Sequence, residues 1–340
     1  MAGSSGFKVV SYNILGHHSW YWDDSWPAKM ADFPWVQRLQ VLEHELSALD
    51  ADVVCCQEVT QDMFASLNAR LAARGYIGLH ALRHLPEWTY DERWESSQLG
   101  IAIFVWHSKF EVVEASHRFA RDLLQEDERQ RPDTHNLSMR LLARPDSVMI
   151  CRLRLKQRGS PPKDLLIACA HAVWWYTDDP QYPISCKPVQ IMLMLRAIDD
   201  FARSRGLDTR RVVLCGDFNT LSCSGSSSSK YDDVAGYELL TTGLLATGHP
   251  EHPAQHGWAL FDLKAPFCMQ SAYVVKLGRE PSFTSRTSTF TATMDYIFVG
   301  DAIEVVDVLP LPEECPPCPN KDHPSDHLPI GANLRMKPWV

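Results

Sequence analysis

The sequence predicts an α/β protein built on one mixed β-sheet, or on two packed mixed sheets with helices outside. Apolar runs of strand length alternate with segments whose apolar residues recur at helical spacing, and several strand-like runs follow one another directly. Consecutive strands argue against a purely parallel, doubly wound sheet, which needs a helix between its strands. Because the 340 residues contain no internal repeat and no domain linker, we expect a single domain over residues 1–340.

In the first third of the chain, predicted strands and helices alternate. Residues 7–13 and 52–56 are short apolar runs, which are typical of buried strands. Residues 35–49 and 60–74 carry apolar side chains three and four positions apart, so each segment predicts an amphipathic helix. The apolar run 99–106 predicts the strand that follows the second helix.

The middle of the chain combines strands with two irregular stretches. The charged residues of 118–133 indicate a solvated excursion, and the aromatic and proline residues of 174–187 indicate a loop. Between these stretches, residues 147–155 and 165–170 predict two consecutive strands. Residues 188–204 return to helical spacing and predict the next helix.

The last third of the chain returns to strands separated by long connections. Residues 211–215 predict a buried strand, and the serine-rich residues 222–229 indicate a flexible loop after it. Residues 294–299 and 303–308 predict two further strands. The proline-rich residues 309–324 then predict a surface loop.

The composition limits the kind of partner that this protein binds. It is that of a folded protein, with 45% hydrophobic and 22% charged residues, and its formal net charge is −9. Proteins that hold long nucleic acids through counterion release are usually basic, so broad binding to a duplex is disfavoured. A short strand, a chain end or a small phosphorylated molecule remains compatible with this charge, because a metal site needs local carboxylates and adds its own positive charge.

The sequence also indicates where the protein works. Residues 1–6 are short and polar, and no apolar run reaches the length of a membrane span. Five of the ten cysteines (Cys55, Cys56, Cys151, Cys169 and Cys215) lie within apolar runs, where a thiol acts as a small core residue, and this usage is typical of a reducing compartment. We therefore expect a cytoplasmic or nuclear protein with no membrane partner. No obligate protein partner is evident, because no leucine-rich repeat precedes the predicted domain.

Polar side chains stand at the ends of several predicted strands. Asn13 ends the first strand, Glu58 follows the second, Asp217 follows the strand 211–215, and the pair Asp326 and His327 follows the proline-rich loop. Buried strands that end on carboxylate, amide or imidazole groups place hard oxygen ligands and a base at one edge of a sheet. This pattern indicates a Mg²⁺ site for phosphate chemistry.

Taken one at a time, these acids also have ordinary structural explanations. Glu58 fits a helix cap or a salt bridge as well as a metal ligand. Asp217 and Asn219 lie two positions apart and would face the same side of an extended segment, where they can orient a water and hold a phosphate oxygen. An Asx turn after a strand has the same sequence.

The remaining candidates are two histidines and one acid within a strand. Asp326 can orient the adjacent His327 and keep it protonated, which suits the charge that develops on a phosphate. Asp295 lies in an otherwise apolar strand, where a carboxylate needs a partner, and His327 fits that role. His171 follows an apolar run, and a lone histidine there is more often packed than catalytic.

In combination and in this order, six segments resemble the motifs of the endonuclease/exonuclease/phosphatase superfamily. This group includes DNase I, abasic-site endonucleases, inositol polyphosphate phosphatases and mRNA deadenylases. The segments are Ser11-Tyr12-Asn13, Gln57-Glu58-Val59, Ala170-His171, Gly216-Asp217-Phe218-Asn219, Met294-Asp295-Tyr296-Ile297 and Ser325-Asp326-His327. The resemblance implies a DNase I-like, four-layer sandwich of two packed mixed β-sheets flanked by helices, with a Mg²⁺ site, or a Mn²⁺ site, at one end.

The resemblance also implies roles for eight residues. Glu58 resembles the main metal ligand, with Asn13 beside it, and Asp326 resembles a residue close to the transition-state charge or to a second metal. The catalytic set that the resemblance implies has five members, of which Asp217 positions or deprotonates the attacking water, Asn219 and His171 contact phosphate oxygens, and Asp295 orients His327.

Within the superfamily, the chain is most similar to the deadenylase branch, which includes nocturnin and the Angel proteins. The segments that carry this likeness are Tyr12-Asn13-Ile14-Leu15, residues 175–182, Lys187, Gln190 and Phe283-Thr284. The Asp-Gly pair usual in this branch is replaced by Leu99-Gly100. We expect Trp175, Lys187 and Phe283 to bind substrate, and for Trp175 base stacking and anchoring of its own loop are alternatives.

The resulting functional prediction is a Mg²⁺-dependent phosphoesterase that hydrolyses phosphate esters of RNA or nucleotides, as a deadenylase-like 3′ exoribonuclease does. Its partner would be an RNA 3′ end or a nucleotide. One alternative is a phosphatase for 2′,3′-cyclic phosphate ends or for the 2′-phosphate of NADP. A non-catalytic nucleotide-binding module and an inositol or lipid headgroup phosphatase are further alternatives.

Overall fold

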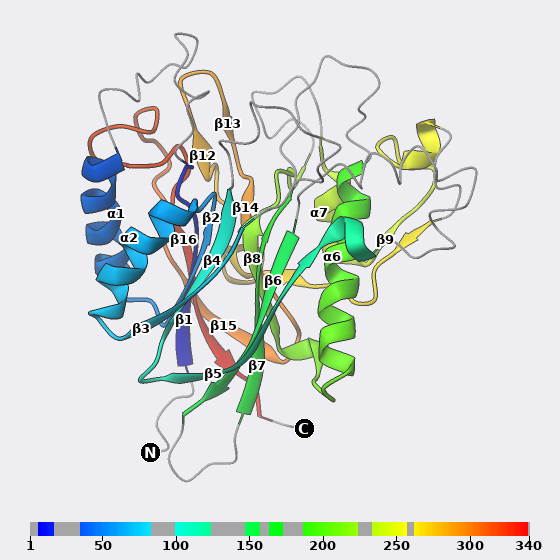
Figure 1. Cartoon of the computed structure of the whole chain (residues 1–340). Helices are drawn as coiled ribbons and strands as arrows, with labels where there is room; N and C mark the ends of the chain where they lie inside the picture. Colours follow the sequence, from blue (N-terminus) through cyan, green and yellow to red (C-terminus); the bar gives the residue numbers. More distant parts are fainter. Residues whose placement is uncertain are drawn as a thin grey trace.

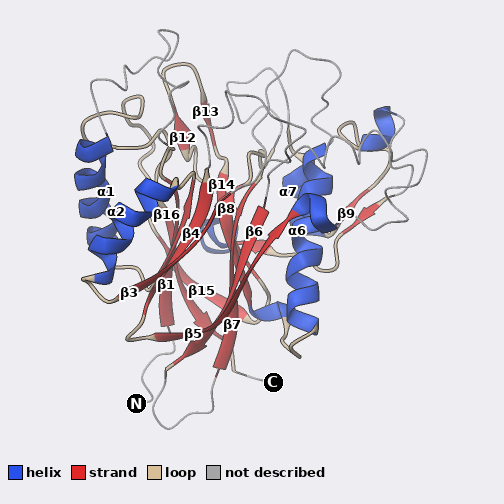
Figure 2. Cartoon of the chain, viewed as in Figure 1, coloured by secondary structure: helices blue, strands red, loops and turns tan. Residues whose placement is uncertain are grey.

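Two six-stranded β-sheets pack face to face, and helices cover their outer faces (Figure 1). Figure 2 colours the strands and helices separately and makes these layers visible. The prediction of a DNase I-like sandwich of two mixed sheets is confirmed. The computed structural model describes residues 6–16, 35–82, 99–123, 147–156, 163–172, 186–223, 233–256 and 262–338.

The first sheet contains both the beginning and the end of the described chain. Its strands are β1 (Gly6–Asn13), β2 (Val53–Gln57), β3 (Tyr76–Leu82), β4 (Gly100–Trp106), β15 (Ile303–Val308) and β16 (Ile330–Met336). They lie in the order β15-β16-β1-β2-β4-β3. β1 and β2 run parallel, and the other neighbouring pairs are antiparallel.

The second sheet comes from the middle of the chain. Its strands are β5 (Phe110–Phe119), β6 (Ser147–Leu155), β7 (Lys163–His171), β8 (Val212–Asp217), β11 (Gln270–Ser271) and β14 (Asp295–Val299). They lie in the order β11-β14-β8-β7-β6-β5. Here β7 and β8 are the parallel pair, and the other neighbours are antiparallel.

Helices cover the outer face of each sheet. The first sheet is covered by α1 (Trp35–Leu49) and α2 (Gln61–Ala72), and the second by α6 (Cys186–Arg203) and α7 (Ala235–Thr242) (Figure 1). The smaller elements are α8 (Ala272–Leu277), the strand pairs β9 (Leu244–Leu245) with β10 (Leu263–Lys264) and β12 (Ser285–Arg286) with β13 (Thr291–Ala292), and 3₁₀ turns at Ala120–Leu123, Thr209–Arg211 and Pro253–His256.

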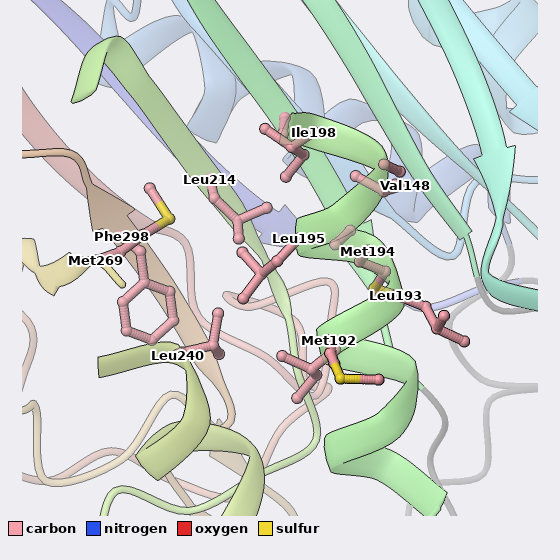
Figure 3. Close-up of a cluster of buried hydrophobic side chains, with 14 of the residues drawn as sticks. Val148, Met192, Leu193, Met194, Leu195, Ile198, Leu214, Leu240, Met269 and Phe298 are labelled. Carbon is pink, nitrogen blue, oxygen red and sulfur yellow. The ribbon is translucent and has the colours of Figure 1, made fainter. Parts of the chain in front are cut away.

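The central strands are apolar throughout because both of their faces are buried. In β2, Val53 and Cys55 face the other sheet, whereas Val54 and Cys56 face the helices α1 and α2. On the other side of the sandwich, α6 packs its apolar side chains onto the outer face of the second sheet, and Figure 3 shows Leu195 among them. A continuous apolar run in the sequence therefore marks a strand between two layers.

Several element boundaries differ from those predicted. The stretch 118–133 is not wholly a solvated excursion, because Arg118 and Phe119 end β5 and residues 120–123 form a 3₁₀ turn. The loop predicted over 174–187 ends earlier, since α6 begins at Cys186 and carries a proline in its first turn, where the missing amide hydrogen costs nothing. Within the two large sheets, the strands β3, β5, β11 and β16 were not predicted from the sequence, and neither were the short strands β9, β10, β12 and β13.

Candidate active site

The polar side chains at the ends of the central strands lie together at one end of each sheet. In the first sheet, parallel pairing places Asn13 of β1 opposite Gln57 of β2, so Glu58 follows beside Asn13. In the second sheet, parallel pairing places His171 of β7 opposite Asp217 of β8.

Antiparallel pairing brings a further acid to the same edge of the second sheet. β14 begins at Asp295, which lies directly opposite Asp217. The two central acids of this sheet are thus fixed by backbone register. They are almost fully buried, each with 2% of its surface exposed.

Asn13 connects the acids of the two sheets. Its Nδ2 donates to Glu58 Oε1 at 3.1 Å and to Asp217 Oδ2 at 3.0 Å. Its Oδ1 accepts a hydrogen bond from the Leu15 amide at 3.0 Å. The metal-ligand candidates of the first sheet and the base candidate of the second therefore lie in one cluster of polar side chains, which we call the pocket.

Glu58 is held from two sides in an uncommon backbone conformation. Its φ is +60°, in the left-handed region that a residue with a Cβ rarely adopts. The Gly16 amide donates to its Oε2 at 2.9 Å, and the following residue, Val59, donates through its backbone to Gly100 O at 3.0 Å. Leu15 and Asn219 also have positive φ, +55° and +50°, so three such residues gather at this edge. Backbone strain of this kind is typical of functional sites.

Asp326 reaches the pocket from the loop that follows β15. Ser325 beside it donates through Oγ to the Asn13 carbonyl at 2.6 Å, which fixes this loop to the end of β1. Burial raises the pKa of Asp326, and the nearby Glu58 carboxylate raises it further, while His327 acts in the opposite direction. The two carboxylates are therefore close enough to repel each other.

The donors in this part of the pocket suit a hard divalent cation. Glu58, Asp326 and Asn13 offer oxygen atoms, which are the ligands that Mg²⁺ and Mn²⁺ prefer in proteins. The repulsion between the two carboxylates would be relieved by a cation between them. The residues present thus fit the metal that the sequence predicts, and their role as ligands stays a prediction.

Asp217 has the electrostatic character of a base that works near neutral pH. Burial raises its pKa to about 7, with a contribution from Asp295, while His327, the Asn13 amide and the Asn219 backbone amide oppose the shift. The Asn219 amide donates to Asp217 Oδ1 at 3.0 Å. A proton acceptor with a pKa near the working pH is well suited to general base catalysis.

His327 and Asp295 form a buried pair. His327 Nδ1 lies 2.7 Å from Asp295 Oδ2, and Thr284 Oγ1 donates to the same oxygen at 2.6 Å. Burial alone would lower the pKa of His327, but Asp295, Asp326 and Asp217 together raise it well above its ordinary value. The three acids therefore favour the protonated form of the imidazole, and the partner that the sequence predicted for Asp295 is present.

The second histidine also faces the central acid. His171 Nε2 lies 3.6 Å from Asp217 Oδ2, and His327 Nε2 lies 3.8 Å from the same oxygen. Within the described residues, Asp217, Asp295 and His327 also bring ligand atoms within 4.8 Å of one another. The 2.7 Å contact of His327 Nδ1 with Asp295 Oδ2 already pairs two members of this group with each other.

Two predicted substrate-binding residues lie beneath the pocket. Lys187 is buried, and its Nζ contacts the Asn219 carbonyl and the Asp233 carboxylate. Phe283 is buried in a small cluster with Cys318 and Leu328. In the conformation described, both side chains contact other residues of the fold, and contact of either one with a substrate stays a prediction. Trp175 lies outside the described residues.

Two residues that support the site were given no role in it by the sequence. Thr284 donates a hydrogen bond to Asp295. Arg38 of α1 donates hydrogen bonds to the loop that follows Asn13 and to the loop that precedes Asp326. Arg38 did leave a signal, because it stands among the apolar positions of a helix whose other buried residues are leucines. A charged residue on the inward face of an amphipathic helix needs a polar partner inside the fold.

The site geometry agrees with a family resemblance found across the chain. Residues 10–327 match the model of the Endonuclease/Exonuclease/phosphatase family. The chain is 26% identical over 355 residues to the CCR4-Not complex 3′-5′-exoribonuclease subunit Ccr4 of Candida albicans, covering 98% of this chain and 42% of that protein. It is 28% identical over 365 residues to Carbon catabolite repressor protein 4 homolog 4 of Arabidopsis thaliana, covering 97% of this chain and 78% of that protein.

A solved structure shares the fold along the whole chain. The structure of ANGEL2, described as a 2′,3′-cyclic phosphatase in complex with adenosine-2′,3′-vanadate, superposes with a TM-score of 0.70 at 22% identity and covers 98% of this chain and 96% of that one. Among the described residues, no helix has both the length and the apolar character that crossing a bilayer requires. The predicted superfamily is confirmed by a family match that includes the acids and histidines of the pocket: the chain belongs to the endonuclease/exonuclease/phosphatase family.

Proposed function

We propose that this protein is a Mg²⁺-dependent phosphoesterase that hydrolyses phosphate esters of RNA or nucleotides, acting as a 3′ exoribonuclease on adenylate ends. The observation that carries the proposal is the Asn13 amide, which contacts Glu58 at 3.1 Å and Asp217 at 3.0 Å. Through this contact the metal-ligand candidates and the base candidate face one pocket. The family match and the two relatives named above support the same reaction class.

The chain's own residues supply a proton acceptor and charge stabilisation for an in-line displacement, in which the water oxygen bonds to phosphorus as the bond to the leaving ester oxygen breaks. When bound by Glu58, Asp326 and Asn13, Mg²⁺ would neutralise charge on the phosphoryl oxygens. Asp217 takes a proton from the attacking water, and its pKa of about 7 makes it an effective acceptor near neutral pH.

Two histidines supply positive charge and hydrogen bonds to the reacting phosphate. Asp295, Asp326 and Asp217 raise the pKa of His327 and so favour its cationic form, and Asp295 at 2.7 Å fixes its orientation. Its Nε2 then donates to a phosphoryl oxygen as charge develops there. His171 Nε2 lies 3.6 Å from the same Asp217 oxygen that His327 approaches, and it would contact the same phosphate.

In the conformation described, Asn219 contacts Asp217 and the backbone. Its Nδ2 donates to the Ala172 carbonyl at 3.0 Å, and its backbone amide donates to Asp217. In the conformation described, Asn219 orients the base candidate. Contact of its Oδ1 with a phosphate oxygen stays a prediction.

A phosphatase for 2′,3′-cyclic phosphate ends is the second candidate function. The likeness to ANGEL2 favours it, since that structure is described with a cyclic vanadate of adenosine. The same pocket would take the phosphoryl group, and the two functions differ in which bond to phosphorus breaks. Hydrolysis of the 2′-phosphate of NADP is related chemistry. For each of these substrates we expect the protein to work in the cytoplasm or nucleus.

A panel of substrates tests the proposal. The purified protein is incubated with Mg²⁺, Mn²⁺ or EDTA and with oligoadenylate, oligouridylate, cyclic-phosphate-ended RNA, NADP⁺ and inositol phosphates. We expect Mg²⁺-dependent shortening of oligoadenylate, its loss in EDTA and its loss in the His327→Ala variant. Release of 2′- or 3′-phosphate from cyclic ends, without shortening, would support the second candidate. No metal-dependent hydrolysis of any substrate would leave a nucleotide-binding module as the better description.

A further inference from the structure

Arg38 is a charged side chain with no exposed surface. It belongs to α1, on the outside of the first sheet, and its relative exposure is 0%. Removing a guanidinium from water is costly unless its hydrogen bonds are replaced. Here its Nε donates to the Pro324 carbonyl at 2.8 Å, and its Nη2 donates to the carbonyls of Ile14 and Leu15, both at 2.5 Å.

The three carbonyls belong to two loops: one directly follows Asn13, and the other contains Asp326. Ile14 and Leu15 directly follow Asn13, and Pro324 lies two residues before Asp326. The first of these loops also reaches Glu58, because its Gly16 amide donates to Glu58 Oε2 at 2.9 Å. One guanidinium therefore contacts both loops from behind the pocket.

The conformation of the first loop depends on such a contact. Leu15 has a φ of +55°, which is unfavourable for a side chain branched beyond Cβ and persists only where neighbouring groups hold it. The Arg38 bond to the Leu15 carbonyl holds the peptide that follows this strained residue. That peptide carries the Gly16 amide that binds Glu58, so the strain and the ligand contact are coupled.

A second residue of α1 contacts the same two segments. Glu45 lies seven positions after Arg38, two turns along the same face of the helix. Its carboxylate accepts from the Tyr12 hydroxyl at 2.9 Å and lies 3.5 Å from His323 Nδ1. Tyr12 precedes Asn13, and His323 precedes Pro324. The helix thus holds both loops at two points.

We infer that Arg38 is a positioning residue, whose guanidinium sets the loop after β1 and the loop 324–327 at the separation at which Asn13, Glu58 and Asp326 face one divalent cation. This inference rests on the proposed metal-dependent function. Arginine suits the task because its planar fork donates in several fixed directions, whereas a lysine ammonium is a single point of charge. A positive charge at this position is therefore not enough to hold both loops, because N–H donors that point in several directions are needed.

The variants Arg38→Lys and Arg38→Gln test the inference. Binding of Mn²⁺ to the substrate-free protein is measured by electron paramagnetic resonance, and activity is measured over a range of Mg²⁺ concentrations. We expect Mn²⁺ affinity to fall by about 10–100-fold in both variants, the range found when groups that orient metal ligands are removed. At low Mg²⁺, kcat should fall while KM for the substrate stays within about twofold, and added Mg²⁺ should restore part of kcat.

Arg70→Lys is the matched control. Arg70 on α2 also contacts α1, through Glu43, but both side chains are partly exposed and away from the pocket. We expect its Mn²⁺ affinity to equal that of the unmodified protein. Arg38 variants that are folded and bind Mn²⁺ as well as this control does would overturn the inference.

A second variant and one further result distinguish failure of this inference from failure of the proposed function. If the Arg38 variants do not fold, Glu45→Gln loosens the same loops through Tyr12 and His323, and we expect a smaller loss of Mn²⁺ affinity in the same direction. Unchanged affinity in Glu45→Gln, with unfolded Arg38 variants, would mean that α1 only stabilises the fold, and the inference would be wrong. A normal protein that binds no Mn²⁺ and hydrolyses none of the panel would instead contradict the proposed function.

Discussion

Asn13 at the end of β1 donates a 3.0 Å hydrogen bond to Asp217 at the end of β8, 204 positions away in the sequence. The contact joins the two sheets of the sandwich at the edge where the polar strand ends gather. Because Asn13 also contacts Glu58, the separation between metal-ligand candidates and base candidate is set by one side chain. The chemistry of this pocket therefore depends on how the two sheets are packed. Single substitutions can test the role of each residue in it.

Replacing Asp217 by asparagine should remove the base and keep the fold. The two side chains have almost the same volume, so we expect an unfolding temperature close to that of the normal protein. Loss of a general base lowers kcat by about 10²–10⁴-fold. Steady-state kinetics on oligoadenylate measures the effect. Asp301→Asn, in the exposed turn beyond the other end of β14, is the control and should leave kcat unchanged. An active Asp217→Asn protein would rule out this base.

Thr284→Val should weaken the Asp295–His327 pair although neither of these two residues is substituted. Thr284 Oγ1 donates to Asp295 Oδ2 at 2.6 Å and accepts from the Met294 and Asp295 amides at 2.9 and 3.1 Å. Losing a hydrogen bond to a charged group costs about 1.5–3 kcal/mol. If that cost appears in the transition state, kcat falls roughly 10–100-fold.

The conservative variant Thr284→Ser separates the hydroxyl from the shape of the side chain. Serine retains the hydroxyl and should keep most of kcat, and KM should not change in either variant. Comparable kcat values in Thr284→Val and Thr284→Ser would show that the Asp295 carboxylate does not need this donor.

Lys187→Met should destabilise the fold instead of weakening substrate binding. The Lys187 ammonium contacts the buried Asp233 carboxylate and the Asn219 carbonyl, and removing one partner of a buried ion pair typically costs about 3–5 kcal/mol. Urea unfolding measures this loss. The double variant Lys187→Met/Asp233→Asn should recover part of it, since no charge is then left buried without its partner.

A surface lysine provides the comparison for this experiment. Lys276 pairs with Asp307 at 3.6 Å and is partly exposed, so Lys276→Met should cost only about 0–1 kcal/mol. For the folded fraction of Lys187→Met, we expect a normal KM. A raised KM with unchanged stability would instead support the prediction that Lys187 contacts substrate.

Glu251 should make the protein less stable as the pH rises towards neutrality. Its carboxylate accepts from the Val234 and Ala235 amides at the start of α7, at 2.9 and 2.8 Å, and burial raises its pKa to about 7. Because the folded-state pKa lies above the unfolded one, its contribution to stability is complete below the unfolded pKa and is lost as the pH rises through about 7.

Glu251→Gln cannot lose a proton and should show a flatter dependence of stability on pH. Relative to the normal protein, we expect it to gain roughly 1–3 kcal/mol of unfolding free energy between about pH 5 and pH 8. Urea unfolding at the two pH values measures the difference. Glu238→Gln, on the exposed side of the same helix, should show the normal dependence. Parallel curves for Glu251→Gln and the normal protein would contradict the prediction.

Much of the fold could be predicted because buried strands are apolar on both faces. The runs at β2, β4 and β8 are nearly continuous, so their sequences alone mark them. β5 and β16 could not be predicted in the same way. β5 lies at the edge of its sheet and contains several charged residues, and β16 contains Gly331 and Asn333, so in both cases the strand exists because its neighbours pair with it.

The sequence by itself determined which chemical groups stand at the strand ends. Carboxylates, amides and imidazoles at Asn13, Glu58, Asp217 and His327 follow from the order of residues, and so does their resemblance to a known family. Only the tertiary structure decided which groups meet, that Lys187 is turned inward and that Arg38 reaches two loops. The physical reason is that strand register and the pairing of buried charges arise from contacts between distant segments, which local patterns of polarity do not encode.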